Sequence, residues 1–272
     1  MIRQRIRRHP IAAFVLVAFG WTWGWYVVFF AFNVWDRFLY TAMPPVWGPL
    51  VGAVAIAWAG ESSIRSWFAR RLSWRVRPAL FLLAVALPLL ITNLQPVIEA
   101  IGGGSLAYDP PAAAHLMVVW VLVNVFVWGG TEEIGWRGVL QPRLQRRTSV
   151  FTAGIAIGLL WWLWHLPLFF TGDPNYSLEP WAFAAYGLFI VGVSTVLAAL
   201  VNASGGSVLP AMVLHGTSNL GAVLAATGGL LAGSPVVPIA GALLWWLIAG
   251  ALLVRYGRSM VPEPSIEPIG TH

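Results

Sequence analysis

Two adjacent carboxylates and a guanidinium interrupt a very apolar part of the chain. Glu132 and Glu133 follow the stretch at 112–128, and Arg137 comes four positions after Glu133. Residues four apart share a helical face, so Glu133 and Arg137 can form an ion pair. Glu132 would point about 100° away, without a partner in its own helix. A carboxylate placed in this way is a candidate general base that takes a proton from water.

The depth of these groups decides between a solvated loop and a membrane site. Residues 113–128 rise only about 24 Å as a helix, short of a hydrocarbon core of about 30 Å. We therefore expect the helix to continue through the glutamates as far as the next breaker, Pro142. An unpaired Glu132 costs roughly a few kcal/mol at that depth. A side chain of a neighbouring helix should therefore meet it.

Two further apolar segments carry polar side chains that can meet Glu132. In the first, Trp161 and His165 share a helical stripe with Gly154 and Gly158, two small residues that favour close helix approach. In the second, His215 and Asn219 lie one turn apart on one helical face. Polar groups are rare in spanning helices and mark functional sites. The predicted polar pocket has catalytic Glu132, His165, His215 and Asn219, supported by Glu133 and Arg137.

Each of these residues has a simpler explanation when it is taken alone. A single buried histidine often packs while bonded to a backbone carbonyl, and Glu133–Arg137 is most simply a structural ion pair. Transporters and channels also place polar groups at depth. They commonly repeat such features in both halves, whereas here the features are confined to 132–219. A non-catalytic membrane immunity or scaffold protein is a third alternative.

The composition is that of one polytopic membrane domain. Of 272 residues, 58% are hydrophobic and 10% are charged, whereas a soluble domain has about 25% charged residues. The absence of cysteine excludes disulfides and thiol nucleophiles. The apolar part of the N-terminal segment is too long for a signal peptide, so we interpret it as a retained first span. All basic residues are arginine, which hints at a bacterial source.

The pattern predicts an all-α fold with about eight transmembrane helices that enclose a polar catalytic cavity. If the N-terminus is cytoplasmic, fifteen of the sixteen arginines fall on that side and Arg37 is the exception. Both termini are then cytoplasmic, in a multi-pass protein of the cell membrane. The net charge of +6 is explained by topology, without a nucleic-acid partner. The predicted spans are 11–32, 43–60, 79–101, 113–131, 150–171, 181–201, 207–230 and 236–256.

The motifs resemble those of a known family. "EEIGWRGVLQPRLQ" is similar to the Glu-Glu-x-x-x-Arg motif of the CAAX-protease and bacteriocin-processing (CPBP, or Abi) intramembrane proteases. "WWLWHLP" resembles their Phe-x-x-x-His motif, with Trp161 in place of phenylalanine, and "HGTSN" resembles their His-x-x-x-Asn motif. The resemblance implies an intramembrane endopeptidase that acts on a membrane-associated peptide or protein. The predicted spans divide the chain into a basic N-terminus (1–10), one transmembrane domain (11–256), which the resemblance makes a protease domain with a motif-bearing core at 113–230, and a disordered cytoplasmic tail (257–272).

Peptide hydrolysis in a membrane needs an activated water, an acid for the leaving amine and donors for the oxyanion. Glu132 is the predicted base, and His165 is expected to hold the water or protonate the amine. The resemblance suggests that His215 and Asn219 face the scissile carbonyl. Zinc remains possible, with Glu132, His165 and His215 as ligands. We favour glutamate-activated water, because the chain has no H-E-x-x-H pair. The site is expected to open toward the cytosol or inner leaflet, ringed by Arg137, Arg143 and an interfacial helix at 61–78.

Overall fold

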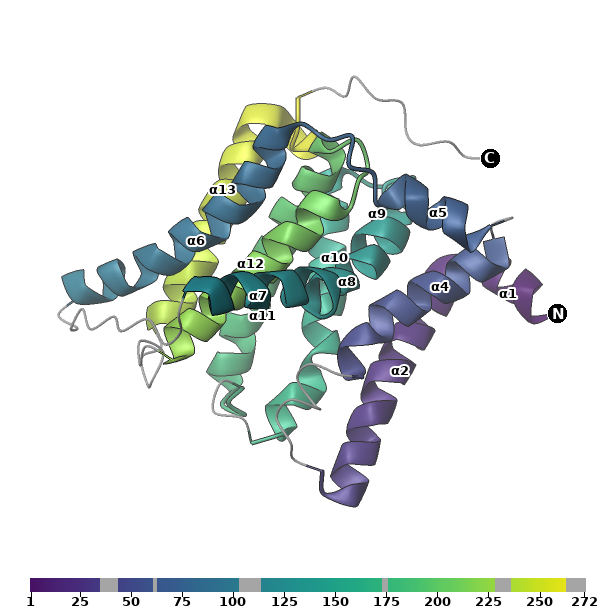
Figure 1. Ribbon diagram of the computed structural model, residues 1–272, viewed down its shortest axis with the longest axis horizontal. Coiled ribbons are helices and arrows are strands. Elements are labelled where there is room, and N and C mark those ends of the chain that lie inside the picture. Colours follow the sequence, from purple (N-terminus) through teal and green to yellow (C-terminus); the bar gives the residue numbers. More distant parts are fainter. Residues whose placement is uncertain (35–43, 61–62, 103–113, 173–175, 228–235, 263–272) are drawn as a thin grey trace.

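The protein is an all-α bundle, as its composition predicts (Figure 1). The computed structural model describes residues 1–34, 44–60, 63–102, 114–172, 176–227 and 236–262, and every element in these ranges is helical. Four short turns, η1 (Pro45–Trp47), η2 (Trp136–Leu140, π-helical), η3 (Leu166–Phe170) and η4 (Gly257–Ser259), complete the fold. The α-helices are α1 (Ile2–Arg8), α2 (Pro10–Phe32), α4 (Gly48–Gly60), α5 (Ile64–Arg71), α6 (Pro78–Ile101), α7 (Ala114–Phe126), α8 (Gly129–Gly135), α9 (Gln141–Leu144), α10 (Val150–Trp164), α11 (Pro180–Ala203), α12 (Leu209–Thr227) and α13 (Val236–Tyr256).

Five segments of the described residues are long and apolar enough to cross a membrane. Two predicted spans, 43–60 and 79–101, correspond to shorter apolar stretches, Pro45–Gly60 and Pro78–Thr92. The predicted span at 207–230 corresponds to α12, a helix of 19 residues. A multi-pass membrane protein is therefore established, and the number of eight spans stays a prediction. The five segments are Pro10–Ala31, Val118–Leu144, Val150–Phe170, Pro180–Ala203 and Ile239–Ser259.

The helices that carry the motifs pack together in the middle of the bundle. α12 contacts α6, α7 and α8, and α8 also contacts α4, which packs on α2. α10 packs along α11, and α11 contacts α13. The side chains of α8 and η2 are all buried, including the charged ones. The first motif is therefore buried by the helices that pack on both sides of it.

The fourth span is helical beyond Trp128, as predicted, but it is not one continuous helix. α7 ends at Phe126, and α8 begins at Gly129 after a non-helical Trp128 (φ −108°, ψ −122°). In Figure 1, α7 lies at an angle to α12. The indole N–H of Trp47 donates to the Val127 carbonyl over 2.7 Å, which satisfies an acceptor that the break releases. The expectation that the helix stops at Pro142 is wrong, because this proline lies in the first turn of α9, where a missing N–H is tolerated.

The glycine face predicted on the fifth span is confirmed as a packing face. A Cβ added at Gly154 would lie 2.8 Å from Thr195 Cα, and one at Gly158 would lie 2.7 Å from Val191 Cα. Real Cβ contacts are not this short, so only glycine permits α10 to lie so close to α11. This contact fixes the height of Trp161 and His165, which follow on the same helix.

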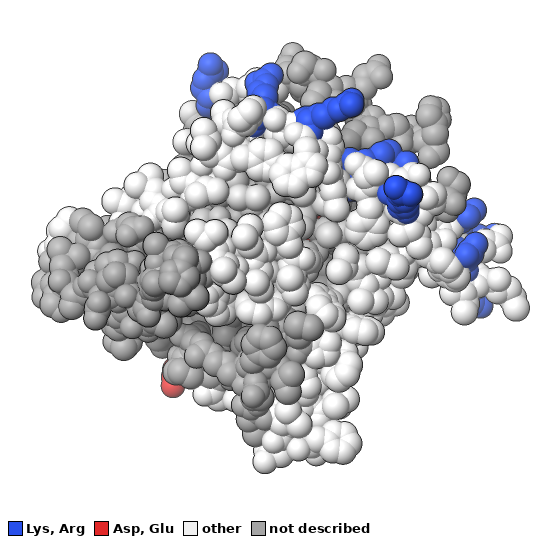
Figure 2. Space-filling view, viewed as in Figure 1, with Lys and Arg blue, Asp and Glu red and all other residues white. Residues whose placement is uncertain are grey.

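The described arginines gather on one side of the molecule. Figure 2 shows them along one edge, over the regions of α1, α5 and the start of α6, while the middle of this face carries almost no charge. By the positive-inside rule this edge is the one expected to face the cytoplasm, and the orientation stays a prediction. Arg137 is the exception, since it is 1% exposed and belongs to the interior.

The predicted disorder of the tail from residue 257 is wrong for its first residues. Gly257–Ser259 form η4, and Met260 is fully buried as part of the hydrophobic core. Burial of the apolar pair Met260 and Val261 stabilises this turn, because apolar surface leaves water. Residues 263–272 lie outside the described residues.

Candidate active site

The carboxylate of Glu132 is met by a tryptophan of the neighbouring α10. Trp161 Nε1 donates to Glu132 Oε2 over 2.8 Å, and both side chains are buried. The sequence predicts such a partner on a neighbouring helix, and the partner is an indole. A neutral N–H donor holds the carboxylate in place without adding the opposite charge that an ion pair would bring.

The second glutamate is fully occupied by two partners. Glu133 Oε2 accepts from Arg137 Nε at 2.9 Å, which confirms the predicted pairing four residues apart. Glu133 Oε1 accepts from Nδ1 of His215 at 2.9 Å. Arg137 Nη2 donates to Ser194 Oγ over 3.0 Å, and this hydroxyl donates to the Gly154 carbonyl over 2.6 Å. A buried polar network thus connects α8, η2, α10, α11 and α12.

His215 and Asn219 face the start of α8. A Cβ added at Gly129 would lie 2.7 Å from His215 Nε2 and 2.4 Å from Asn219 Nδ2. Since His215 Nδ1 donates to Glu133, the ring directs its other nitrogen toward Gly129. Asn219 Nδ2 also donates to Asn124 Oδ1 over 3.2 Å. The third motif therefore places two nitrogen atoms together beside the backbone of α8.

His165 lies one turn beyond Trp161, at the end of α10. Its Nδ1 donates to the Trp161 carbonyl over 2.7 Å, which leaves Nε2 as the acceptor or proton carrier. The Trp161 ring lies between the two histidines, with centroids 5.7 Å from His165 and 5.0 Å from His215. By helical rise, Trp161 is about 16 Å from Val150 and His165 about 22 Å. The hydrogen bond between Trp161 and Glu132 places these two residues side by side, and His165 lies one turn further along the chain.

The motifs that form this site occupy the part of the chain that matches known proteins. Residues 114–221 match the family described as type II CAAX prenyl endopeptidase Rce1-like. Over 148 residues, 53% of this chain, the protein is 29% identical to CAAX prenyl protease 2 of Methanococcus maripaludis. The motif-bearing part of the chain is therefore similar to CAAX proteases. The chain covers 51% of the length of that relative, about half.

The sequence did not reveal every polar member of this candidate site. Trp161 is expected only to share a helical stripe with His165 and to replace the phenylalanine of the motif, yet its N–H is the donor to Glu132. Asn124, which donates to the Trp120 carbonyl over 2.9 Å and accepts from Asn219, joins the third motif to α7. Ser194 joins Arg137 to α10. A signal existed for Asn124, a polar residue two turns before Glu132, but Ser194 has no distinctive spacing.

A zinc ligand set is not gathered among the described residues of the candidate site. Among the described residues, no three His, Asp or Glu side chains come together in a group that could hold a metal ion. His165 Nδ1 is engaged by the Trp161 carbonyl, and His215 Nδ1 is engaged by Glu133. These bonds leave Nε2 of each ring free, as in zinc-binding histidines, so they do not decide the question. Glu132, His165 and His215 are nevertheless not gathered as one ligand group in the described part of the chain, and the reaction proposed below uses side chains alone.

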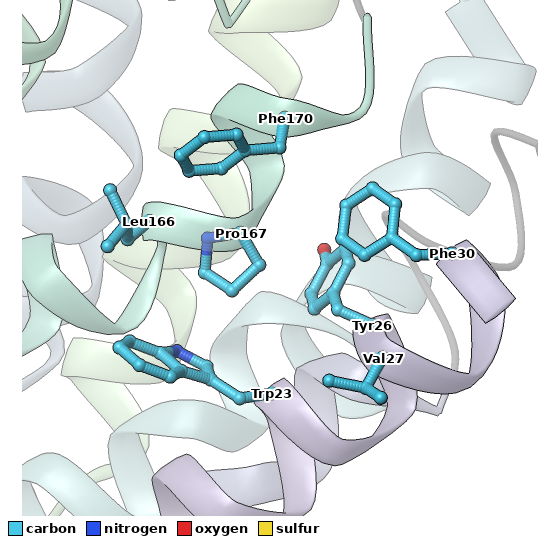
Figure 3. Close-up of a pocket in the computed structure, with 7 residues that line it drawn as sticks. All are labelled: Trp23, Tyr26, Val27, Phe30, Leu166, Pro167 and Phe170. Carbon is cyan, nitrogen blue, oxygen red and sulfur yellow. The ribbon is translucent and has the colours of Figure 1, made fainter.

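The side chains of the candidate site are packed together, and the two arginines predicted to ring its opening do not do so. Arg137 is buried and cannot ring an opening. Arg143 lines a basic hollow near α1 that contains none of the six site residues. A second pocket of about 220 Å³, lined mainly by aliphatic and aromatic side chains, lies between α2 and η3, the turn that follows His165 (Figure 3). Trp23, one of its lining residues, donates to the Trp164 carbonyl over 3.1 Å.

The ion pair of Glu133 allows a prediction about stability. Glu133→Gln leaves the guanidinium of Arg137 buried without its counter-charge, which typically costs about 3–5 kcal/mol. We expect a clear fall in the unfolding midpoint, measured by thermal or SDS titration in detergent. The double variant Glu133→Gln/Arg137→Met should recover much of the loss, because no buried charge is left unpaired. If the single and double variants lose the same stability, the pair does not act as described.

Proposed function

We propose that this protein is an intramembrane endopeptidase that hydrolyses a peptide bond in a membrane-associated peptide or protein with water activated by Glu132. The observation that carries the proposal is the contrast between the two adjacent glutamates. Glu133 is bound through both oxygens by Arg137 and His215. Glu132 is bound by the neutral indole of Trp161 and has no guanidinium partner among the described residues. The similarity of residues 114–221 to CAAX prenyl endopeptidases supports peptide hydrolysis as the chemistry.

In the proposed reaction, Glu132 removes a proton from water and the resulting hydroxide attacks the scissile carbonyl carbon. The carbonyl oxygen becomes an oxyanion, which needs donors close to the place where the charge develops. Asn219 Nδ2 and, in the protonated ring, His215 Nε2 supply these donors, with His215 Nδ1 held by Glu133. When the C–N bond breaks, the departing amine takes the proton that Glu132 removed from water, either directly or relayed through His165 Nε2. The products are a carboxylic acid and an amine, and transfer of the acid proton to the amine gives a carboxylate and an ammonium group.

The substrate is proposed only by class. The curated relative is named a CAAX prenyl protease, and that name describes the relative. For this chain we propose a peptide or protein tail held at the membrane, prenylated or not. The lipid bilayer is the environment, and both termini are proposed to be cytoplasmic.

A reconstitution experiment tests the proposed function. Purified protein in liposomes is incubated with a library of apolar peptides, and products are identified by mass spectrometry while ion flux is recorded. We expect cleavage by the wild type and none by Glu132→Ala. Flux without cleavage would favour a transporter or channel and would contradict the proposal. Absence of both activities would favour a non-catalytic scaffold.

Trp161 is proposed as a positioning residue, because this chain has tryptophan where the motif has phenylalanine. Trp161→Phe keeps an aromatic ring and removes the donor to Glu132. A hydrogen bond to a charged group contributes about 1.5–3 kcal/mol, so kcat should fall about 10- to 100-fold with KM nearly unchanged. The matched control is Trp162→Phe, whose indole donates to the Phe183 carbonyl away from the site. Equal losses in the two variants would show that the Trp161 donor has no special role.

A further inference from the structure

A hollow of about 210 Å³ lies at the arginine-rich edge, apart from the candidate active site. It is formed where α1 meets α2, at the end of α4, and beside α9. We call it the basic hollow. Its charged lining residues are Arg7, Arg143 and Arg146, and its apolar lining includes Ile6, Pro10 and Ile56.

Backbone carbonyls orient two of these arginines. Arg7 Nε donates to the carbonyl of Ala59, near the end of α4. Arg143 Nη1 donates to the Val139 carbonyl over 2.8 Å. A guanidinium held in this way loses less freedom when a ligand binds, which favours affinity. The third arginine, Arg146, is exposed and completes the group from the turn after α9.

The charge of the basic hollow selects an anion. No carboxylate is among its described lining residues. Glu61 follows Gly60 in the sequence and lies outside the described residues; if its charge is counted, three arginines still exceed it by two. Guanidinium groups form paired hydrogen bonds with phosphate oxygens and are preferred for phosphate recognition. A phosphate is therefore the ligand group that the residues favour.

The apolar lining indicates that this phosphate belongs to a lipid. Pro10 begins α2, the first membrane-spanning segment, so the basic hollow lies at the level where a span leaves the bilayer. Ile6 and Ile56 offer apolar contact beside the arginines, which a soluble phosphate does not need. The inner leaflet carries anionic phospholipids that attract such basic clusters. We propose that the basic hollow binds the phosphate of an anionic phospholipid of the cytoplasmic leaflet.

Lipid binding in nanodiscs tests this proposal on the full chain. The probe is phosphatidylglycerol added to phosphatidylcholine nanodiscs, and bound lipid is counted by native mass spectrometry. Each arginine near a membrane surface contributes about 1 kcal/mol, so each replacement should weaken binding about fivefold. Arg7→Gln/Arg143→Gln/Arg146→Gln should then weaken it about a hundredfold. Arg146→Gln alone, at an exposed site, keeps the test valid if the triple variant does not fold.

A matched control separates a specific site from general attraction. Arg255→Gln/Arg258→Gln removes two arginines that do not line the basic hollow. This control should retain binding of phosphatidylglycerol, and equal weakening would overturn the proposal. A further arm adds inorganic phosphate to phosphatidylcholine nanodiscs. If phosphate alone stabilises the protein as much as phosphatidylglycerol, and displaces it, the ligand is a free phosphate and the lipid proposal fails.

Discussion

Glu132→Gln is expected to lower kcat at least about a hundredfold, because general-base catalysis contributes about 10²- to 10⁴-fold. The substitution is nearly isosteric, and its amide oxygen can still accept from Trp161 Nε1. It also replaces a buried carboxylate by a neutral group, so no loss of stability is expected. The adjacent Glu133→Gln should behave differently, since it breaks a buried ion pair. The rate of peptide cleavage and the unfolding midpoint, measured on the same preparations, separate the two glutamates.

The control for this substitution is Glu179→Gln. Glu179 is exposed at the start of α11, so this substitution removes the same charge at a position outside the candidate site. It should retain wild-type cleavage. Adding His215→Ala to Glu132→Gln should reduce the rate by less than the product of the two single effects, because both groups act on one transition state. A Glu132→Gln variant that keeps more than about a tenth of the activity would exclude Glu132 as the base.

The sequence predicted those parts of the site that depend on helical periodicity. The spacing of Glu133 and Arg137 on one helix predicts their contact, and the structure confirms it at 2.9 Å. The burial of Glu132 follows from the length of the apolar stretch, and so does the need for a partner on another helix. The glycine face of α10 follows from a four-residue period and is also confirmed.

Relative positions of neighbouring helices could not be predicted in the same way. Periodicity tells which residues share a face, but it does not tell how far one helix slides along another. The bond between Glu133 and His215 depends on that offset between α8 and α12. The break at Trp128 was missed for a different reason. No proline marks the break. The Val127 carbonyl, which the break leaves without a helical partner, accepts from the indole of Trp47, 80 residues away in the sequence.

The same break gives Gly129 a role that leads to a second large effect. Gly129 is the first residue of α8, and the position where a Cβ would be attached faces His215 Nε2 and Asn219 Nδ2 of the third motif. In Gly129→Ala the added Cβ would lie 2.4 Å from Asn219 Nδ2 and 2.7 Å from His215 Nε2. Ordinary van der Waals contact begins near 3.4 Å, so both groups must move by roughly 1 Å. A displacement of about 1 Å at a catalytic site can cost about a hundredfold in rate.

Cleavage by Gly129→Ala is therefore expected to fall about a hundredfold, mainly in kcat, because the displaced nitrogen atoms are the proposed oxyanion donors. The matched control is Gly24→Ala in the spanning helix α2, where nothing lies within 4 Å of an added Cβ. It makes the same chemical change without a clash and should keep full activity. The unfolding midpoint of both variants shows whether the fold is retained. If Gly129→Ala folds and cleaves like the wild type, then His215 Nε2 and Asn219 Nδ2 do not act at this position, and the proposed oxyanion site is wrong.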